Sequence, residues 1–285
     1  MRISTEIGSA ARLIGEEKAV ELVAKAGFDA YDFSMFPMAQ YDWGTGSVVH
    51  NGHPLSGKDY LQFVRNIRHI AEDNGIVCNQ SHAPFPVYIK EIWGYLERAI
   101  ECTAEAGGKI CVIHPDNRKS PAENAEMYHV LLPIAKSYGV HIATENMWGW
   151  DSVADHAIPN ACSTPQNFKE HLETVNDPFL VACLDIGHGE MKGLGTSAVE
   201  LIHTLGDHLQ ALHIHDNDRW HDSHALPFTK DIDFDAVVKA LKEIDYKGDF
   251  TLEADQHLVS ADTVAQGLKE MAQAARRLAD MFDRA

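Results

Sequence analysis

Six short apolar segments of this chain end in side chains that could bind a divalent metal ion. These side chains are, in order, His82, His114, Glu145, Asp185, His215 and Glu253. Steps of 40, 30 and 38 residues separate the last four, and each step is long enough for one strand and the helix that follows it. Carboxylates and imidazoles form a mixed donor set that suits Mn²⁺, Co²⁺, Zn²⁺, Fe²⁺ or Mg²⁺. One such residue alone is an ordinary polar group, but the recurrence predicts a shared metal site.

The chain alternates between β-branched apolar runs and longer amphipathic stretches from one end to the other. The predicted strands are Arg2–Ile7, Phe28–Phe33, Ile76–His82, Lys109–His114, Val140–Glu145, Leu180–Asp185, Ala211–His215 and Asp249–Glu253. The predicted helices are Glu16–Ala26, Asp59–Asn74, Tyr88–Ala106, Ala122–Tyr138, Pro165–Val175, Ser197–Leu205, Asp233–Glu243 and Asp262–Ala279. Gly27 and Gly139 directly follow helices, where glycine accepts the left-handed conformation that ends them. Eight such units without a break in composition predict an α/β protein, a (β/α)8 TIM barrel that forms a single domain over residues 1–285.

Composition excludes several classes of partner. The 42 acidic and 24 basic side chains give a formal net charge of −18, which disfavours binding to nucleic acid and to anionic membrane surfaces. No segment is long and apolar enough to span a membrane, and Glu6 lies where a signal peptide would be apolar, so we expect a cytoplasmic protein. The five cysteines include no C-x-x-C pair, and we expect them to be reduced thiols in the core.

In a barrel of this kind the active site lies at the C-terminal ends of the strands, where the six side chains should converge. His213 shares a strand face with His215, so we expect it one layer deeper, as a supporting or core residue. The following loop contains Arg219, Asp222 and His224. Asp222 and His224 could bind a further metal ion or close the loop through polar contacts.

Aromatic residues of the predicted loops suggest a surface for a sugar. Trp43, Trp148, Trp150 and Trp220 fall after the second, fifth and seventh strands, where they could pack on the C–H face of a sugar ring or fill a small core of the loops themselves. The long segment Ser34–Gly57 is the expected mobile lid. No glycine-rich phosphate loop is present, so free and phosphorylated sugars both remain open.

Five motifs together resemble the xylose isomerase-like TIM barrel superfamily, which includes sugar and sugar phosphate isomerases and epimerases, inosose dehydratases and the endonuclease IV group. The motifs are Thr144-Glu145-Asn146, Leu184-Asp185-Ile186-Gly187-His188, Leu212-His213-Ile214-His215-Asp216-Asn217, Asp222-Ser223-His224 and Leu252-Glu253. The resemblance to the epimerases implies that Glu145, Asp185, His215 and Glu253 bind one catalytic metal ion. It further implies substrate contacts from His188 and Arg219, although the spacing from His215 to Arg219 departs from the epimerase pattern. The stretch 226–233 departs as well, because Phe228 and Lys230 stand where a Pro-Gly-x-Gly sequence is common.

The resemblance to endonuclease IV implies a larger metal centre. There His82, His114 and Glu145 would bind a second metal ion, and His188, Asp222 and His224 a third. The net charge of −18 and the absence of a basic loop cluster argue against a DNA repair nuclease.

We therefore expect a metal-dependent sugar or polyol isomerase or epimerase, with Mn²⁺ first among the metals and Co²⁺, Mg²⁺ and Zn²⁺ as alternatives. The metal would stabilise an enediolate, while Glu145 and Glu253 remove and return a proton next to the carbonyl. His188, Arg219, Trp148 and Trp43 are the expected substrate contacts. A lyase on the same site, such as an inosose-type dehydratase or an enzyme that eliminates from an oxidised sugar, is the first alternative, followed by an endonuclease and a catalytically silent binding protein. The resemblance also implies a homo-oligomer.

Overall fold

Eight parallel strands close into a barrel in the computed structural model, which describes residues 1–285. Six strands pair in the order β11-β10-β7-β6-β5-β2, and β1 pairs with β12. Parallel bridges from Glu6 to Asp32 and from Ile214 to Leu252 join these two sheets and complete the circle. The predicted (β/α)8 barrel is confirmed. Its strands are β1 (Ile3–Thr5), β2 (Ala30–Ser34), β5 (Val77–His82), β6 (Ile110–Val112), β7 (His141–Glu145), β10 (Leu180–Asp185), β11 (Leu209–His213) and β12 (Phe250–Leu252).

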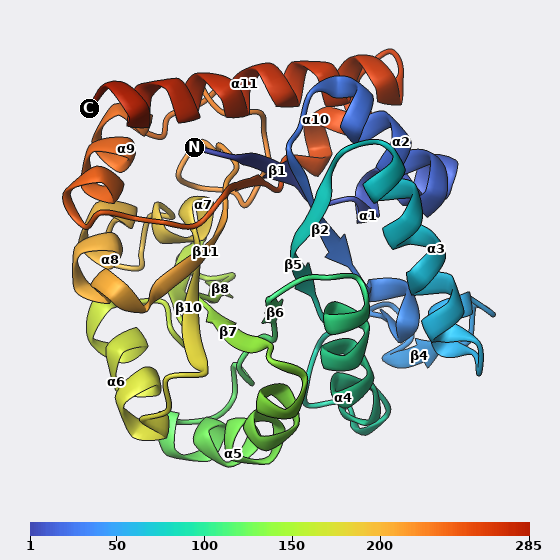
Figure 1. Cartoon of the computed structure of the whole chain (residues 1–285). Coiled ribbons are helices and arrows are strands. Elements are labelled where there is room, and N and C mark those ends of the chain that lie inside the picture. Colours follow the sequence, from blue (N-terminus) through green and yellow to red (C-terminus); the bar gives the residue numbers. More distant parts are fainter.

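Helices surround the barrel as an outer ring (Figure 1). The ring is formed by α2 (Glu16–Ala26), α3 (Tyr60–Asp73), α4 (Lys90–Glu105), α5 (Pro121–Tyr138), α6 (Pro165–Val175), α8 (Ala198–Leu205), α9 (Phe234–Glu243) and α11 (Val264–Arg284). Short helical segments lie in the connections: α1 (Gly8–Ile14), α7 (Ile186–Gly189), α10 (Asp255–Ser260), η1 (Phe36–Met38), η2 (Pro54–Ser56) and η3 (Gly206–His208). No helix combines the length and apolar character needed to cross a bilayer.

Local sequence signals explain where the helices begin and end. At the start of α5, the Ser120 hydroxyl accepts a hydrogen bond from the Glu123 N–H, and the Glu123 carboxylate accepts one from the Ser120 N–H. The same helix ends at Gly139, whose φ of 66° is the left-handed conformation that glycine adopts without a Cβ clash. These signals fix the helix bounds close to the predicted ones.

Side chains alternate between the inside and the outside of the barrel along each strand. On β10, Leu180, Ala182 and Leu184 belong to a 67-residue core between strands and helices. Val181 and Cys183 belong instead to a small separate cluster formed with residues of β6, β7 and β11. Because Asp185 follows Cys183 by two residues, it continues the inner face and points into the mouth of the barrel.

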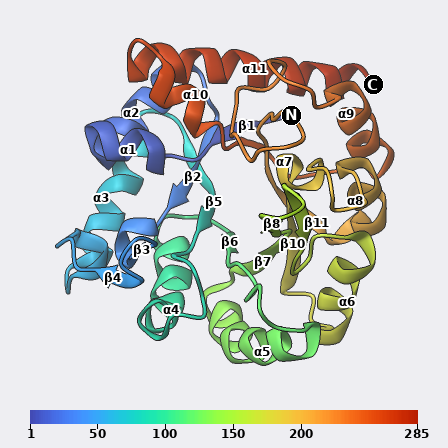
Figure 2. The same ribbon diagram turned by 180° about the vertical axis from the view of Figure 1, so that it is seen from behind.

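Two antiparallel hairpins extend from the C-terminal side of the barrel. The first, β3 (Gln40–Asp42) with β4 (Ser47–Val49), lies within the predicted lid segment, and the second, β8 (Trp148–Asp151) with β9 (His156–Pro159), follows β7. Seen from behind in Figure 2, the first hairpin lies at the periphery near α3. The sequence pattern does not predict either hairpin, because three- and four-residue strands are too short to show an alternating pattern.

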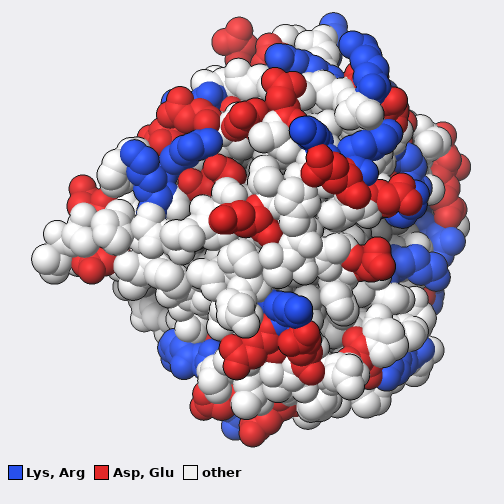
Figure 3. Space-filling model, turned by 90° about the vertical axis from the view of Figure 1, so that its left-hand side faces the viewer, with Lys and Arg blue, Asp and Glu red and all other residues white.

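Charged side chains of both signs are interspersed on the face that Figure 3 shows, without a continuous basic area. This mixture fits the excess of acidic over basic residues in the sequence. A duplex-binding surface would instead concentrate Lys and Arg on one face.

All five cysteines are buried and unpaired, so we expect the folded protein to resist thiol reagents. Burial raises the pKa of Cys111 to about 11 and that of Cys183 to about 12, which leaves little of the reactive thiolate near neutral pH. A chromogenic disulfide reagent should therefore detect no fast-reacting thiol in the native protein and all five in guanidinium chloride. Rapid reaction of a native thiol would contradict the burial of all five cysteines.

Candidate active site

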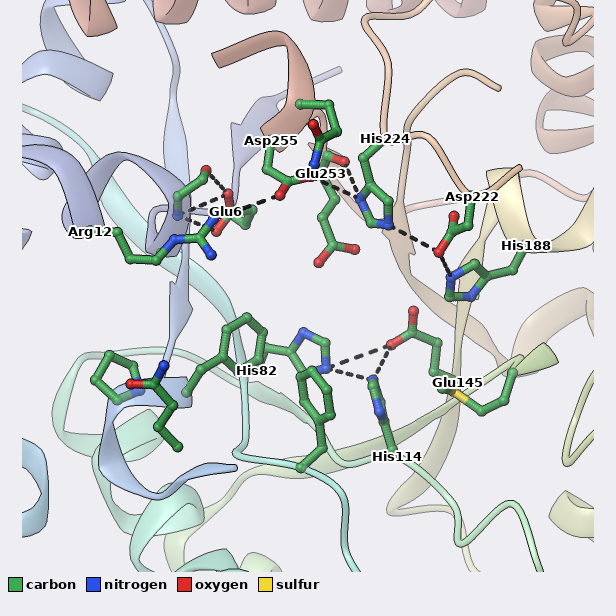
Figure 4. Close-up of a pocket in the computed structure, with 18 of the residues that line it drawn as sticks. Glu6, Arg12, His82, His114, Glu145, His188, Asp222, His224, Glu253 and Asp255 are labelled. Atoms are coloured by element: carbon green, nitrogen blue, oxygen red, sulfur yellow. Dashed lines mark hydrogen bonds and ion pairs between the residues drawn. The ribbon is translucent and has the colours of Figure 1, made fainter. Parts of the chain in front are cut away.

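A cavity of about 510 Å³ opens at the C-terminal end of the barrel, where the loops that follow the strands meet (Figure 4). Most of the predicted site residues line it. These are His82, His114, Glu145, Trp148, His188, Asp222, His224 and Glu253. Parallel strands end on the same side of a barrel, which is why residues up to 171 positions apart share one cavity.

Glu145, Asp185, His213 and Glu253 form the central cluster of the site. One potential ligand atom of each lies within 4.8 Å of those of the other three. The Nδ1 atom of His213 is 3.1 Å from Glu145 Oε1 and 3.4 Å from Glu253 Oε2. The predicted set of four contained His215 in place of His213; the His215 Nε2 atom contacts one member of the central cluster, at 3.2 Å from Asp185 Oδ1.

Strand register explains why His213 occupies the central cluster. Asp185 and His213 are paired residues of the neighbouring strands β10 and β11, so they lie at the same height in the barrel. His215 comes two residues later, beyond the end of β11, and its ring packs directly on the backbone of Gly187. A Cβ added at Gly187 would lie 2.0 Å from His215 Cε1, so this approach requires glycine.

His215 belongs to a second cluster with His188, Asp222 and His224. Its Nε2 atom is 3.3 Å from Asp222 Oδ1 and 3.2 Å from Asp185 Oδ1, and its ring stacks on that of His224 with centroids 4.0 Å apart. Asp222 Oδ2 is also 3.3 Å from His188 Nε2 and 3.4 Å from His224 Nε2. Asp222 therefore links three imidazoles.

His82, His114 and Glu145 form a third cluster on the other side of the central one. The Nε2 atoms of the two histidines are 2.7 Å apart, and Glu145 Oε2 lies 3.2 Å from His114 Nε2 and 3.8 Å from His82 Nε2. Glu145 is thus shared, because its Oε1 atom faces His213 in the central cluster.

The two glutamates of the central cluster differ in their electrostatic surroundings. Burial raises the pKa of Glu253 to about 8, although the charges of His213 and His224 act in the opposite direction. Burial also disfavours ionisation of Glu145, but the charge of His213 and the hydrogen bonds from His114 and His213 outweigh burial and hold the pKa of Glu145 well below its usual range. Two carboxyl groups with opposite shifts are the arrangement that separates an acid from a base in one site.

Several buried polar atoms of these clusters lack a hydrogen-bond partner. They are Glu145 Oε2, Asp185 Oδ2, Asp222 Oδ1 and His215 Nε2. Unsatisfied buried polar atoms are costly, and carboxylate oxygens beside imidazole nitrogens are the donors that divalent first-row metals prefer. The residues present therefore fit a bound divalent metal ion.

Residues 20–283 match the model of the family described as xylose isomerase-like TIM barrel. The chain belongs to this family. It is 28% identical over 239 residues to an uncharacterized protein of Methanocaldococcus jannaschii, a match that covers 77% of this chain and 78% of the relative.

Solved structures of similar barrels extend the comparison. A structure described as a D-tagatose 3-epimerase-like protein matches 100% of this chain and 99% of its own with a TM-score of 0.74 at 19% identity. A structure of L-ribulose 3-epimerase matches 99% of this chain and 95% of its own with a TM-score of 0.72 at 16% identity. At these identities the likeness establishes the shared fold.

Two of the expected substrate contacts lie outside the cavity of this xylose isomerase-like barrel. Arg219 does not line it, since its Nη2 atom is 3.3 Å from Glu190 Oε2 in a separate depression. Trp43 is 66% exposed on the β3–β4 hairpin and packs edge-on against Tyr41. Trp148 does line the cavity, and its Nε1–H donates to Asp222 Oδ2 at 3.3 Å.

Asp216 holds the loop that carries Asp222 and His224. Its buried carboxylate accepts hydrogen bonds from the backbone N–H groups of Thr229, Lys230 and Ile232 at 3.0, 2.8 and 3.1 Å. These hydrogen bonds therefore fix the backbone conformation of the loop, although it lacks the Pro-Gly-x-Gly sequence that is common in the family. This role was not predicted from the sequence.

Asp32 is a further buried carboxylate that the sequence analysis missed. Its Oδ2 atom is 3.2 Å from His213 Nε2 and accepts a hydrogen bond from Gln80 Nε2 at 2.9 Å. This contact directs the opposite ring nitrogen, Nδ1, toward Glu145 and Glu253. A carboxylate behind a ligand histidine fixes the ring and its tautomer. The available signal was an aspartate inside the apolar strand β2.

We expect Asp32→Asn to raise the dissociation constant for Mn²⁺ by about 10–100-fold, the usual effect of losing a partner of a ligand histidine. Titration calorimetry on the metal-free protein measures this constant, and Asp73→Asn on the exposed face of α3 is the matched control. An unchanged constant in a folded Asp32→Asn variant would show that Asp32 does not position His213.

Proposed function

We propose that this protein is a divalent-metal-dependent sugar epimerase or isomerase. One observation carries the proposal: Glu145 and Glu253 line the same cavity and share a metal-suited cluster with Asp185 and His213. Two carboxylates beside one metal ion can remove and return a proton on the carbon next to a carbonyl group. The names of the two similar structures, both 3-epimerases or epimerase-like, support a sugar as substrate.

Glu145, Asp185, His213 and Glu253 would hold the metal ion, and Mn²⁺ is the metal we propose first. When bound, the ion would supply a positive charge that stabilises the negative charge developing on the substrate oxygens. Asp32 holds the His213 ring in place for this task. The Asn146 side chain holds Asp185, since its amide donates to the Asp185 carbonyl at 2.9 Å and accepts from the Asp185 N–H at 2.7 Å.

Proton transfer falls to the two glutamates. One of them removes the proton from the carbon next to the carbonyl, and the other returns a proton to the opposite face, which inverts that carbon. His188 lines the cavity beside Asp222 and would contact a substrate hydroxyl, while the Trp148 ring would pack on the apolar face of the sugar. Return of the proton to the neighbouring carbon would give an isomer, and loss of a leaving group would give an elimination product.

Product analysis on a panel of ketoses tests this proposal. The Mn²⁺-loaded protein is incubated with D-fructose, D-tagatose, D-ribulose and D-xylulose, and chromatography identifies the products. We expect the carbon-3 epimer of at least one ketose to accumulate to equilibrium. An aldose would indicate isomerisation, an unsaturated sugar would indicate the lyase alternative, and the absence of any product would contradict the proposal.

The clusters on either side of the central one favour a second candidate, a metal-dependent phosphodiesterase with two or three metal ions. His82 and His114 on one side, and Asp222 and His224 on the other, provide ligands for additional ions. Against a nucleic-acid substrate, Arg12 is the one Lys or Arg side chain that lines the cavity. Metal analysis by mass spectrometry separates the candidates: one ion per chain supports the epimerase, whereas two or three zinc ions with cleavage of an abasic DNA duplex would support the phosphodiesterase.

A further inference from the structure

We propose that the end of the cavity formed by Glu6, Arg12, Asp255 and Gln256 is a subsite for the uncharged, hydroxyl-bearing end of a free sugar, and that it rejects a terminal phosphate. The inference rests on the proposed function, because it concerns the same cavity. In Figure 4, Glu6, Arg12 and Asp255 lie on one side of the cavity, and His188 and Asp222 lie on the other. A sugar whose carbonyl lies at the central cluster would extend its far end toward one of these sides.

The first backbone N–H groups of α1, which could bind a phosphate at this end, already have partners. Phosphates in barrels are commonly bound by the N-terminus of a short helix, and two short helices, α1 and α10, begin at this end. The first residue of α10 is Asp255, whose acidic side chain opposes a phosphate at that terminus. The Ser9 N–H donates to both carboxylate oxygens of Glu6 at 3.3 and 3.2 Å, and the Gly8 N–H donates to Ser34 Oγ at 3.3 Å. A phosphate could reach these donors only by displacing the Glu6 carboxylate from Ser9 and the Ser34 hydroxyl from Gly8.

Hydrogen bonds also fix the Glu6 carboxylate in place. The Ser34 hydroxyl donates to Glu6 Oε2 at 3.0 Å, and the Ser9 hydroxyl donates to Glu6 Oε1. Glu6 is nevertheless part of the cavity wall, next to Gly8 and Ser9. A carboxylate held in this way is preorganised to accept hydrogen bonds from sugar hydroxyl groups.

The charge balance at this end is acidic. Arg12 is the single Lys or Arg side chain of the cavity, is 65% exposed, and lies 3.7 Å from the Asp255 carboxylate. Its charge is therefore offset by Asp255, and Glu6 remains as an additional acidic group. Like charges placed together across a binding site cost several kcal/mol, so a phosphate dianion is disfavoured. The Gln40 and Gln256 amides, which also line the cavity, can donate to and accept from neutral hydroxyl groups.

Paired substrates test the subsite: D-fructose against D-fructose 6-phosphate, and D-ribulose against D-ribulose 5-phosphate, with the Mn²⁺-loaded protein. For the pair that reacts, we expect kcat/KM for the free sugar to exceed that for its phosphate by on the order of 100-fold, the effect of an unfavourable charge contact. Equal or faster reaction of the phosphate would overturn the inference.

Charge-removing variants connect the selectivity to the named residues. The double variant Glu6→Gln, Asp255→Asn should lower the preference for the free sugar by about tenfold or more, because the repulsion is removed. The control variant Glu17→Gln, Asp73→Asn removes two exposed charges on the outer helices and should leave the preference unchanged. Arg12→Ala should retain the preference. Loss of phosphate turnover in Arg12→Ala, with an unaltered preference in the double variant, would instead make Arg12 a phosphate ligand and contradict the subsite.

A binding measurement separates failure of the subsite from failure of the proposed function. If no sugar reacts, the epimerase proposal is wrong, and thermal unfolding of the Mn²⁺-loaded protein with each sugar then decides the inference. A rise in Tm with the free sugars that exceeds the rise with their phosphates, after correction for inorganic phosphate alone, would support the subsite. A larger rise with the phosphates, or no rise with any sugar, would overturn it.

Discussion

Replacing Glu145 with glutamine is expected to lower kcat for sugar epimerisation by about 10³-fold or more. An amide keeps the shape of the side chain but cannot accept a proton, and loss of a positioned general base typically costs 10²–10⁴-fold. Glu145 also contributes to two clusters, with Oε1 facing His213 and Oε2 facing His114, so the loss of metal adds to the effect. Initial rates with the reactive ketose measure the change.

Two controls belong with this experiment. Glu170→Gln changes the same functional group at an exposed position on α6 and should react as fast as the wild type. Metal content of the Glu145→Gln protein, determined on the same sample, shows how much of the loss arises from an empty site. Near wild-type turnover in Glu145→Gln would remove Glu145 from the mechanism.

His213→Gln is expected to weaken Mn²⁺ binding far more than His215→Gln. His213 contacts Glu145 and Glu253, whereas His215 lies with Asp222 and His224 and reaches the central cluster only through Asp185. Since losing a partner behind a ligand costs about 10–100-fold in metal affinity, we expect the loss of His213 to exceed 100-fold and that of His215 to stay below it. Titration calorimetry on both metal-free variants measures the two constants.

The histidine pair makes this comparison internally controlled. Both variants carry the same substitution at neighbouring inward-facing positions, so a general effect on folding would affect both. A greater loss of affinity in His215→Gln than in His213→Gln would restore the ligand set of Glu145, Asp185, His215 and Glu253. It would also show that the register of β11 does not determine which histidine binds the metal.

The barrel could be predicted because each strand and helix leaves a signal in its own short stretch of sequence. Alternating apolar runs mark the strands, glycines such as Gly139 mark helix ends, and both signals recur through the chain. The helix α6 and the strand β10 that follows it illustrate this, because Pro165–Val175 and Leu180–Asp185 were both predicted with their observed bounds. The short hairpins lacked such a signal.

The choice between His213 and His215 shows where prediction from one sequence ends. Alternation along a strand tells which residues share a face, and both histidines do. The height of each histidine in the barrel depends on the pairing of β11 with β10. This pairing joins residues 28 positions apart, so no short stretch of sequence reveals it. Arg219 and Trp43 do not line the cavity. Their positions in loops do not reveal whether a side chain turns into the cavity or, as for Arg219, toward Glu190.

Transfer of deuterium from the solvent to a ketose tests the central claim most directly. The Mn²⁺-loaded protein and a chelator-treated sample are incubated in D2O with the panel of ketoses, and NMR follows the hydrogen on the carbon next to the carbonyl. We predict deuterium at that carbon with the loaded protein, none with the treated sample, and recovery when Mn²⁺ is restored. Epimer formation without deuterium, or deuterium uptake that is equal in the treated sample, would contradict metal-dependent proton transfer by Glu145 and Glu253.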